Sequence, residues 1–390
     1  MIKQKQIPKK TGGKNNKKSG GNKNNKNNKN KREKVLTAGR IIFLTFLSLV
    51  LVLFLLTFLF LRYYSPTIAE IENPSIAGWV DDDDLPPEYA FDAMQRTDGI
   101  YTFLLLGLHD DGFLTDTMIF ITFDTVDKTV GVLNIPRDTY VNALGYAGKK
   151  INGVFKSGYN ASINAGKNKD EAKEDGVKAV VRMIKVTFGL PVNKYILADL
   201  DGFRALVDAV GGVDMDVPVR MKYTDPYQDL YIDLQPGFQH LDGGKAEQLI
   251  RFRSYPMADI ERIRTQQKFM AALTKKMMKF DVGQIKKLFD INSKYVKTNI
   301  TTIETGWFAA KMLDVKFEHI RMHTIPGEEY WVGADSCLST YKAEVMEIIN
   351  KYYNPYTEEI PANNFNIFEP SRTYAYLANI DGITMDSLVK

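Results

Sequence analysis

The chain has 390 residues, 44% of them hydrophobic and 12% aromatic, which suits one large domain with attachments or two modest domains. Residues 1–40 contain fourteen Lys or Arg and one acid, and subtracting this +13 from the net charge of +4 leaves −9 for the rest. A single cysteine, Cys337, excludes a disulfide scaffold. The acidic folded part argues against a DNA-binding regulator, and we expect no nucleic-acid partner.

Residues 1–40 are predicted to be a disordered basic cytoplasmic tail, because Lys, Asn and Gly bury too little surface to offset the entropy cost of ordering. Residues 41–62 are predicted to be a transmembrane anchor. The run from Ile41 to Leu61 is apolar except for two threonines and a serine, long enough to span a bilayer, and lacks the features of a cleaved signal peptide. The cationic flank predicts a single-pass protein of the cell membrane, with its tail inside near anionic lipid and its folded domain outside.

The rest of the chain divides into three parts by composition. Residues 63–96 contain four prolines and the acidic run Asp81–Asp84, which predicts an extracytoplasmic spacer. Residues 97–355 carry the strong strand and helix patterns and are predicted to be the folded domain. Residues 356–390 have weak periodicity and are a C-terminal extension to which the sequence assigns no role.

Strand and helix patterns alternate along the folded domain, and this alternation predicts a layered α/β fold. Short β-branched and apolar runs predict strands, whereas apolar residues at helical spacing, ended by glycines, predict helices. The expected strands are 101–108, 117–123, 129–135 and 213–219, and the expected helices are 171–188, 199–210 and 258–278.

Three groups of residues contain arginines that suit an anionic ligand. Arg137 follows a strand that Pro136 ends, and ligands of α/β sheets bind beyond strand ends; a surface ion pair with Asp138 is the alternative. In Arg251-Phe252-Arg253, an extended chain would place both guanidiniums on one side, where a phosphate would offset their repulsion. On the last predicted helix, one face carries Asp259, Arg262 and Gln266, although a solvated helix edge explains that line equally well.

An acidic group lies between the first two predicted strands. Asp110 and Asp111 follow the first strand, and Asp116 begins the second. Carboxylates that face several arginines suggest Mg²⁺ held on a diphosphate, whereas an Asp-rich turn alone is usually only a turn.

Taken together, these motifs and their order over residues 99–355 resemble the LytR-CpsA-Psr family. The blocks that carry the resemblance are Phe103-Leu-Leu-Leu-Gly107, Thr115-Asp116-Thr117-Met118, Ile135-Pro136-Arg137-Asp138, Lys150-Ile151-Asn152, Gly211-Gly212-Val213, Gly237-Phe-Gln-His-Leu-Asp-Gly243, Arg251-Phe252-Arg253 and Asp259 with Arg262, Gln266 and Gln267.

The resemblance implies a three-layer α/β/α sandwich with a central mixed sheet, preceded by one transmembrane helix, and a deep apolar pocket for a polyprenyl chain. It implies a Mg²⁺-dependent phosphotransferase of cell-wall assembly that moves an anionic glycopolymer, such as a teichoic acid or a capsule, from a polyprenyl diphosphate to peptidoglycan. Asp116, with Asp110, would hold the metal; Asp116, Arg137, Arg251 and Arg253 would be catalytic, and Lys150, Asp259, Arg262 and Gln266 would bind the diphosphate.

The sequence departs from the family's pattern at three positions. His109 stands where an aspartate is usual, and Leu114 and Thr265 stand where arginines are usual. Either Asp110 or Asp111 replaces the missing aspartate, and Arg264 or another cation replaces the missing arginines, or this copy is catalytically weak. The alternative function is a non-catalytic or regulatory binder of polyprenyl-phosphate-linked envelope precursors. A polyprenyl-diphosphate pyrophosphohydrolase is a further alternative.

Overall fold

The computed structural model describes residues 89, 94–108, 113–228, 230–255, 258–281, 283–285, 288, 295–369 and 379–389. The predicted tail and anchor, most of the predicted spacer, and His109, Asp110 and Asp111 lie outside these residues. In the described part of the chain, no helix is both long and apolar enough to cross a membrane.

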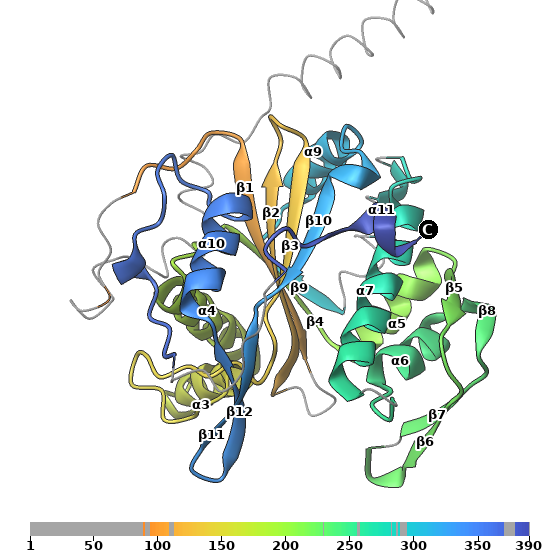
Figure 1. Ribbon diagram of the computed structural model, residues 1–390, viewed down its shortest axis with the longest axis horizontal. Helices are drawn as coiled ribbons and strands as arrows, with labels where there is room; N and C mark the ends of the chain where they lie inside the picture. Colours follow the sequence, from red (N-terminus) through yellow and green to blue (C-terminus); the bar gives the residue numbers. More distant parts are fainter. Residues whose placement is uncertain are drawn as a thin grey trace, which may run out of the picture. The chain divides into compact units, whose positions relative to one another are not determined.

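A seven-stranded mixed sheet forms the centre of the fold (Figure 1). Its order is β13-β10-β3-β2-β1-β4-β9, in which β1 pairs with β4 and β3 with β10 in parallel, and the other pairs are antiparallel. The predicted α/β fold with a central mixed sheet is confirmed. The strands are β1 Ile100–Leu108, β2 Thr115–Asp124, β3 Thr129–Asn134, β4 Lys194–Ala198, β9 Val296–Thr298, β10 Ile320–Thr324 and β13 Ile383–Thr384.

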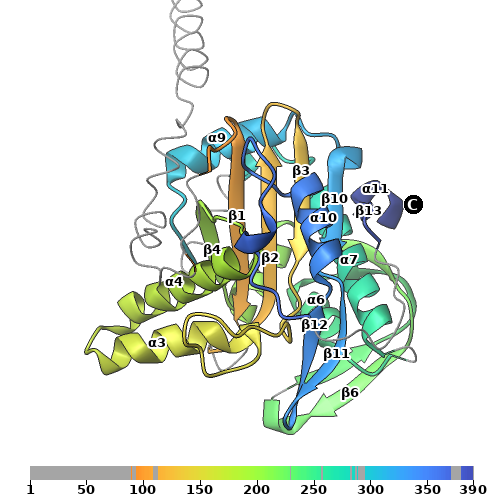
Figure 2. The ribbon, with the colours of Figure 1, turned by 60° about the vertical axis from the view of Figure 1, so that its left-hand side comes forward.

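Helices cover both faces of the sheet because strand side chains alternate between them (Figures 1 and 2). Leu104 and Leu106 of β1 enter a core with α4 and α10, whereas Tyr101 enters a second core with α7, α9 and α11. Both faces are therefore buried, which explains the nearly continuous apolar runs of β1 to β3. The first face is covered by α3 Val154–Asn164, α4 Lys169–Phe188 and α10 Lys342–Tyr352, and the second by α7 Ala258–Met277, α9 Thr302–Met312 and α11 Met385–Leu388.

A third core lies among the elements between β4 and α7. Val207, Met215, Ile232 and Leu249 are buried in it, together with Phe269 from α7. The elements are α5 Leu200–Ala209, the strand pair β5 Val213–Val217 and β8 Gly237–Leu241, the strand pair β6 Met221–Asp225 and β7 Leu230–Leu234, with the 3₁₀ turn η5 Pro226–Gln228 at its tip, and α6 Gly243–Arg251.

The predicted helices and strands are present, with small shifts at their ends that local contacts explain. Helix α4 begins earlier than expected because Asn168 forms a capping box with Glu171, and it ends at Gly189 in the left-handed conformation. In α5, Asp199 is the N-cap rather than the first helical residue.

The C-terminal extension contributes to the folded domain. Its β13 pairs with β10, and Ile360 and Phe365 are buried in the core that contains α4 and α10. His323 of β10 is 3% exposed; its Nδ1 lies 2.8 Å from the Tyr353 hydroxyl and its Nε2 lies 3.0 Å from the Ile380 carbonyl. Burial lowers the pKa of His323 to about 4, so the ring is neutral at physiological pH.

Candidate functional site

Two charged residues meet where β2 begins and β3 ends. The Ile135 amide donates to the Met118 carbonyl, which extends the pairing of β2 and β3 up to Pro136. Arg137 follows directly, and its Nη1 donates to Asp116 Oδ1 at 2.8 Å, while its Nε lies 3.5 Å from Asp138 Oδ2. Arg137 therefore lies beyond the end of a strand, as the sequence predicts, and it also makes the ion pair that was the alternative.

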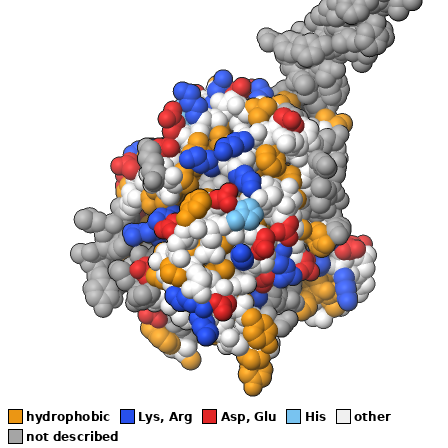
Figure 3. Space-filling model, turned by 90° about the vertical axis from the view of Figure 1, so that its right-hand side faces the viewer, with side chains coloured by type: hydrophobic (Ala, Val, Ile, Leu, Met, Phe, Trp, Pro, Cys, Tyr) orange, Lys and Arg blue, Asp and Glu red, His pale blue; other side chains and the backbone are white. Residues whose placement is uncertain are grey.

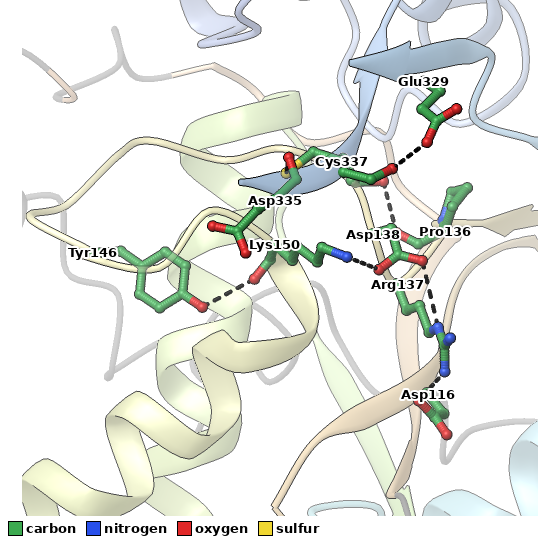
Figure 4. A network of polar contacts seen from close by, with 11 residues as sticks. Asp116, Pro136, Arg137, Asp138, Tyr146, Lys150, Glu329, Asp335 and Cys337 are labelled. Carbon is green, nitrogen blue, oxygen red and sulfur yellow. Dashed lines mark hydrogen bonds and ion pairs between the residues drawn. The ribbon is translucent and has the colours of Figure 1, made fainter. Parts of the chain in front are cut away.

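Lys150 joins this pair through Asp138. Its Nζ donates to Asp138 Oδ1 at 2.8 Å, so a single carboxylate bridges Lys150 and Arg137 (Figure 4). The backbone fixes this arrangement, because the Ile151 amide donates to the Thr139 carbonyl and Tyr146 donates its hydroxyl proton to the Lys150 carbonyl. Asp138 was considered from the sequence only as an ion-pair partner, yet it connects the two cations.

The charges around Arg137 stabilise its protonated form. Burial by itself lowers the pKa of Arg137, but the carboxylates of Asp116 and Asp138 outweigh it and raise the pKa above its ordinary value. The Arg137 side chain is about a quarter exposed, so it is held by two carboxylates and still reaches solvent. A fixed, partly exposed cation of this kind suits an incoming anion.

The geometry of the Arg251-Phe252-Arg253 motif differs from the prediction. Asp242 caps α6, and the helix continues through Arg251, so the chain is extended only from Phe252 onward. The expectation that a common extended register aligns the two arginines is therefore wrong. Phe252 is buried against Tyr255, with ring centroids 4.9 Å apart, and this packing fixes the point at which the chain leaves the helix.

Three arginines nevertheless lie near enough to Arg253 for their charges to act on it. The pKa of Arg253 is lowered first by burial and then by the positive charges of Arg137, Arg262 and Arg251, with Asp116 acting in the opposite direction. These side chains come from the ends of β2 and β3, from α6 and the residues after it, and from α7. Their mutual repulsion favours an anion between them, since a like-charge cluster is relieved when a negative group binds.

Glu247 is a residue that the sequence interpretation missed. Its side chain is 11% exposed, and it accepts from Arg251 Nη1 at 2.9 Å and from Arg204 Nη1 at 2.5 Å. The shared carboxylate joins α5 to α6 and holds Arg251 in place. The signal was present in the sequence, because Glu247 and Arg251 are four residues apart on one helix.

Helix α7 brings its predicted residues to this region in different ways. Arg262 acts electrostatically on Arg253, whereas the Gln266 Nε2 donates to the Ile250 carbonyl at 2.9 Å and so fastens α7 to α6. Thr265 is 3% exposed and Arg264 is exposed, so these neighbours point in different directions. Arg264 is thus poorly placed to stand in for an arginine at position 265. The side chain of Asp259 lies outside the described residues.

The carboxylates at this site fit a metal that arrives with a ligand rather than one caged by protein. No group of three or more His, Cys, Asp or Glu that could hold a metal ion occurs among the residues that the structure describes. Asp116 and Asp138 flank Arg137 and supply two carboxylates of the hard oxygen type. Mg²⁺ in phosphate sites uses one or two carboxylates and takes its other ligands from phosphates and water, so this donor set fits.

Basic and acidic side chains are mixed on the right-hand side of the molecule as Figure 1 shows it. On the face that Figure 3 shows, blue and red groups are interspersed, and no single sign of charge covers it.

These features define an α/β protein with an arginine-rich site at the ends of two strands. The LytR_cpsA_psr family model matches residues 79–353, and the chain belongs to this family.

Two curated relatives resemble the chain in sequence. TagV of Bacillus subtilis, a polyisoprenyl-teichoic acid–peptidoglycan teichoic acid transferase, is 28% identical over 233 residues, which cover 57% of this chain and 56% of TagV. The regulatory protein MsrR of Staphylococcus aureus is 26% identical over 216 residues, which cover 54% of this chain and 60% of MsrR. The similarity thus spans little more than half the length of these relatives.

Solved structures show the same fold. The crystal structure of B. subtilis TagV superposes with a TM-score of 0.51 at 26% identity and covers 63% of this chain and 92% of TagV as crystallised. A structure of TagT bound to LIIa-WTA superposes with a TM-score of 0.52 at 19% identity, covering 70% of this chain and 96% of that one. The likeness to TagT concerns the fold alone.

Proposed function

We propose that the chain is a membrane-anchored phosphotransferase that moves an anionic glycopolymer from a polyprenyl-diphosphate carrier to peptidoglycan, outside the cell membrane. The observation that carries the proposal is that Arg137, Arg251 and Arg262 lie near enough to Arg253 for their charges to act on it, beside Asp116, which pairs with Arg137 at 2.8 Å. A diphosphate is the anion that such a cluster fits best, because several guanidiniums together match its many oxygens. Membership of the family and the resemblance to TagV support it.

In the proposed reaction, a sugar hydroxyl of peptidoglycan attacks the phosphorus that carries the glycopolymer. The new phosphorus–oxygen bond replaces the bond to polyprenyl phosphate, which leaves with the electron pair, and the hydroxyl proton passes to solvent. Phosphoryl transfer of this kind depends on positioning and on neutralising negative charge more than on covalent chemistry. Arg253 and Arg262 bind the phosphate oxygens, and Arg137 is held by Asp116 and Asp138 so that it meets them in a fixed orientation.

Mg²⁺ is part of the proposal, and Asp116, with Asp110, is the residue that would hold it. The ion would supply further charge neutralisation on the diphosphate. Asp138 contacts both Lys150 and Arg137, and so it holds two cations in place for the diphosphate.

The experiment that tests the proposal measures polyprenyl phosphate released from a polyprenyl-diphosphate glycan by the full-length chain in detergent. It is run with and without peptidoglycan glycan strands as acceptor, and with and without Mg²⁺. Acceptor-dependent release that requires Mg²⁺ and is lost in Asp116→Ala supports the transferase. Release that does not depend on acceptor indicates a pyrophosphohydrolase instead.

A non-catalytic binder of lipid-linked precursors is the second candidate. It is favoured by His109, Leu114 and Thr265, and by the burial of Thr265, which leaves no guanidinium at that position of α7. Its readout is retention of the lipid-linked glycan without turnover. If turnover appears only in a His109→Asp variant, the unmodified chain is a binder whose fold and remaining site residues can still support catalysis.

A further inference from the structure

A β-hairpin extends beyond the sheet next to the candidate site. It consists of β11 Gly327–Val332 and β12 Asp335–Thr340, joined by a two-residue turn in which Gly333 has a φ of +67° (Figures 1 and 2). A left-handed φ at this position favours glycine and gives a tight turn. The hairpin is therefore a defined structure whose two faces can be read from its pairing.

One face of the hairpin carries aromatic, acidic and hydroxyl side chains instead of arginines. Trp331 pairs with Ser336 and Glu329 with Leu338, so these four side chains share a face. Trp331 is 60% exposed, and the Ser336 hydroxyl donates to Glu329 Oε1 at 2.5 Å. The face therefore presents a flat aromatic ring beside a carboxylate and a hydroxyl, and it carries no cation.

Backbone contacts fasten the hairpin to the segment that carries the site residues. The Leu338 amide donates to the Asp138 carbonyl, and the Tyr140 amide donates to the Leu338 carbonyl, both at 2.8 Å. The hairpin tip is held as well, because Lys149 Nζ donates to the Val332 carbonyl at 2.7 Å and lies 3.1 Å from Asp335 Oδ2.

These contacts connect the hairpin directly to the chain segments that carry Asp138 and Lys150. Lys149 is the chain neighbour of Lys150, so the same short segment holds the hairpin tip and the Asp138 carboxylate (Figure 4). The hairpin is therefore fastened to the segment that carries Asp138 and Lys150.

We propose that the Glu329–Trp331–Ser336 face of the hairpin binds the pyranose rings of a glycan. An indole ring supplies large, rigid apolar area for the C–H side of a sugar, while the carboxylate and hydroxyl supply hydrogen bonds for its hydroxyl groups. The absence of a cation from these four positions disfavours phosphate. The further step, that this glycan is the acceptor of the transfer reaction, rests on the proposed function. Binding of glycan to the hairpin does not depend on it.

The test measures binding of soluble, uncrosslinked peptidoglycan glycan strands to the full-length chain in detergent. Trp331→Ala is expected to weaken binding about 10-fold, and Trp331→Phe to keep most of it, because a phenyl ring retains the flat apolar surface. Tyr227→Ala is the matched control, since Tyr227 is fully exposed at the tip of the β6–β7 hairpin. It should bind like the unmodified chain.

Equal binding by the unmodified chain, Trp331→Ala and Tyr227→Ala overturns the inference. A second result also overturns the inference: Trp331→Ala loses binding to vesicles of anionic phospholipid but still binds glycan. That result assigns the tryptophan to contact with a membrane surface. Trp331-dependent glycan binding without any transfer supports the inference while refuting the transferase. When transfer is present, Trp331→Ala should raise the KM for acceptor and leave acceptor-independent release of polyprenyl phosphate unchanged.

Discussion

Arg137 and Asp116 face each other across the paired strands β2 and β3, with Arg137 Nη1 donating to Asp116 Oδ1 at 2.8 Å while Nε lies 3.5 Å from Asp138. One guanidinium therefore meets two carboxylates through different nitrogens. A lysine ammonium is a point charge on a flexible stem and cannot reproduce this planar arrangement. The position thus depends on the shape of the cation as well as on its charge.

Arg137→Lys is expected to lower turnover about 100-fold or more, the scale seen when one preorganised donor is lost. Stability should change by about 1 kcal/mol or less, because the pair is only partly buried. Release of polyprenyl phosphate and urea denaturation measure the two effects. Arg220→Lys is the control, since Arg220 also pairs with a carboxylate, Asp233, and donates to the Leu234 carbonyl, but lies beside the β6–β7 hairpin. Equal losses of turnover in both variants contradict the assignment.

Arg253→Ala should abolish turnover and leave stability unchanged or slightly higher. Burial and the neighbouring arginines disfavour the charged side chain in the free protein, so its removal relieves repulsion. Phe252→Ala is the contrasting variant, because Phe252 is 2% exposed and its truncation should cost about 3–5 kcal/mol. Thermal unfolding and turnover are measured on both. If Arg253→Ala unfolds, the arginine is structural.

Glu247→Gln should weaken binding of the diphosphate donor more than it slows the chemical step. Glutamine keeps the volume but loses the charge that Arg204 and Arg251 share, so Arg251 is no longer held in one place. The loss of stability should be about 1–3 kcal/mol. The kcat and KM for the donor are determined separately. Asp201→Asn, which alters the exposed partner of Arg204, is the control and should leave both values unchanged.

Acidification should destabilise the protein through His323. Its folded pKa of about 4 lies below the ordinary value of 6.5, so the unfolded chain binds more protons between these values. The contribution is fully present above pH 6.5 and is lost as the pH falls toward 4, by up to about 3 kcal/mol. Urea titrations at several pH values give the free energy of unfolding at each pH. This free energy should fall less steeply with decreasing pH in His323→Gln than in the unmodified chain. His319→Gln, at an exposed histidine, should keep the slope of the unmodified chain.

The elements of the fold were predictable where local forces decide them. The runs of β1 to β3 are apolar because both faces of the sheet are buried, and Gly189 ends α4 because a left-handed residue closes the helix. Arg251 was not assigned to an element, because Arg-Phe-Arg suits a strand and a helix end equally well. The cap at Asp242, nine residues upstream, decided between them.

The site was harder to predict than the fold, because its residues come from separate stretches. Spacing placed Arg137 at a strand end, but it contained no information that Arg137, Arg253 and Arg262 approach one another. That expectation came only from the family resemblance. Asp138 was considered only as a surface ion-pair partner of Arg137, and Glu247, four residues before Arg251, was not considered.

The pairing of β13 with β10 affects the order in which the chain can fold. The edge of β10 is closed by residues 383–384, and Asn379 and Ile380 lie in the segment that covers His323. During synthesis, the edge of β10 has no hydrogen-bonding partner until residues 383–384 have been made. An unpaired strand edge of this kind can pair with other chains. A product that stops before residue 379 should therefore self-associate, even though every residue of the arginine cluster has already been synthesised.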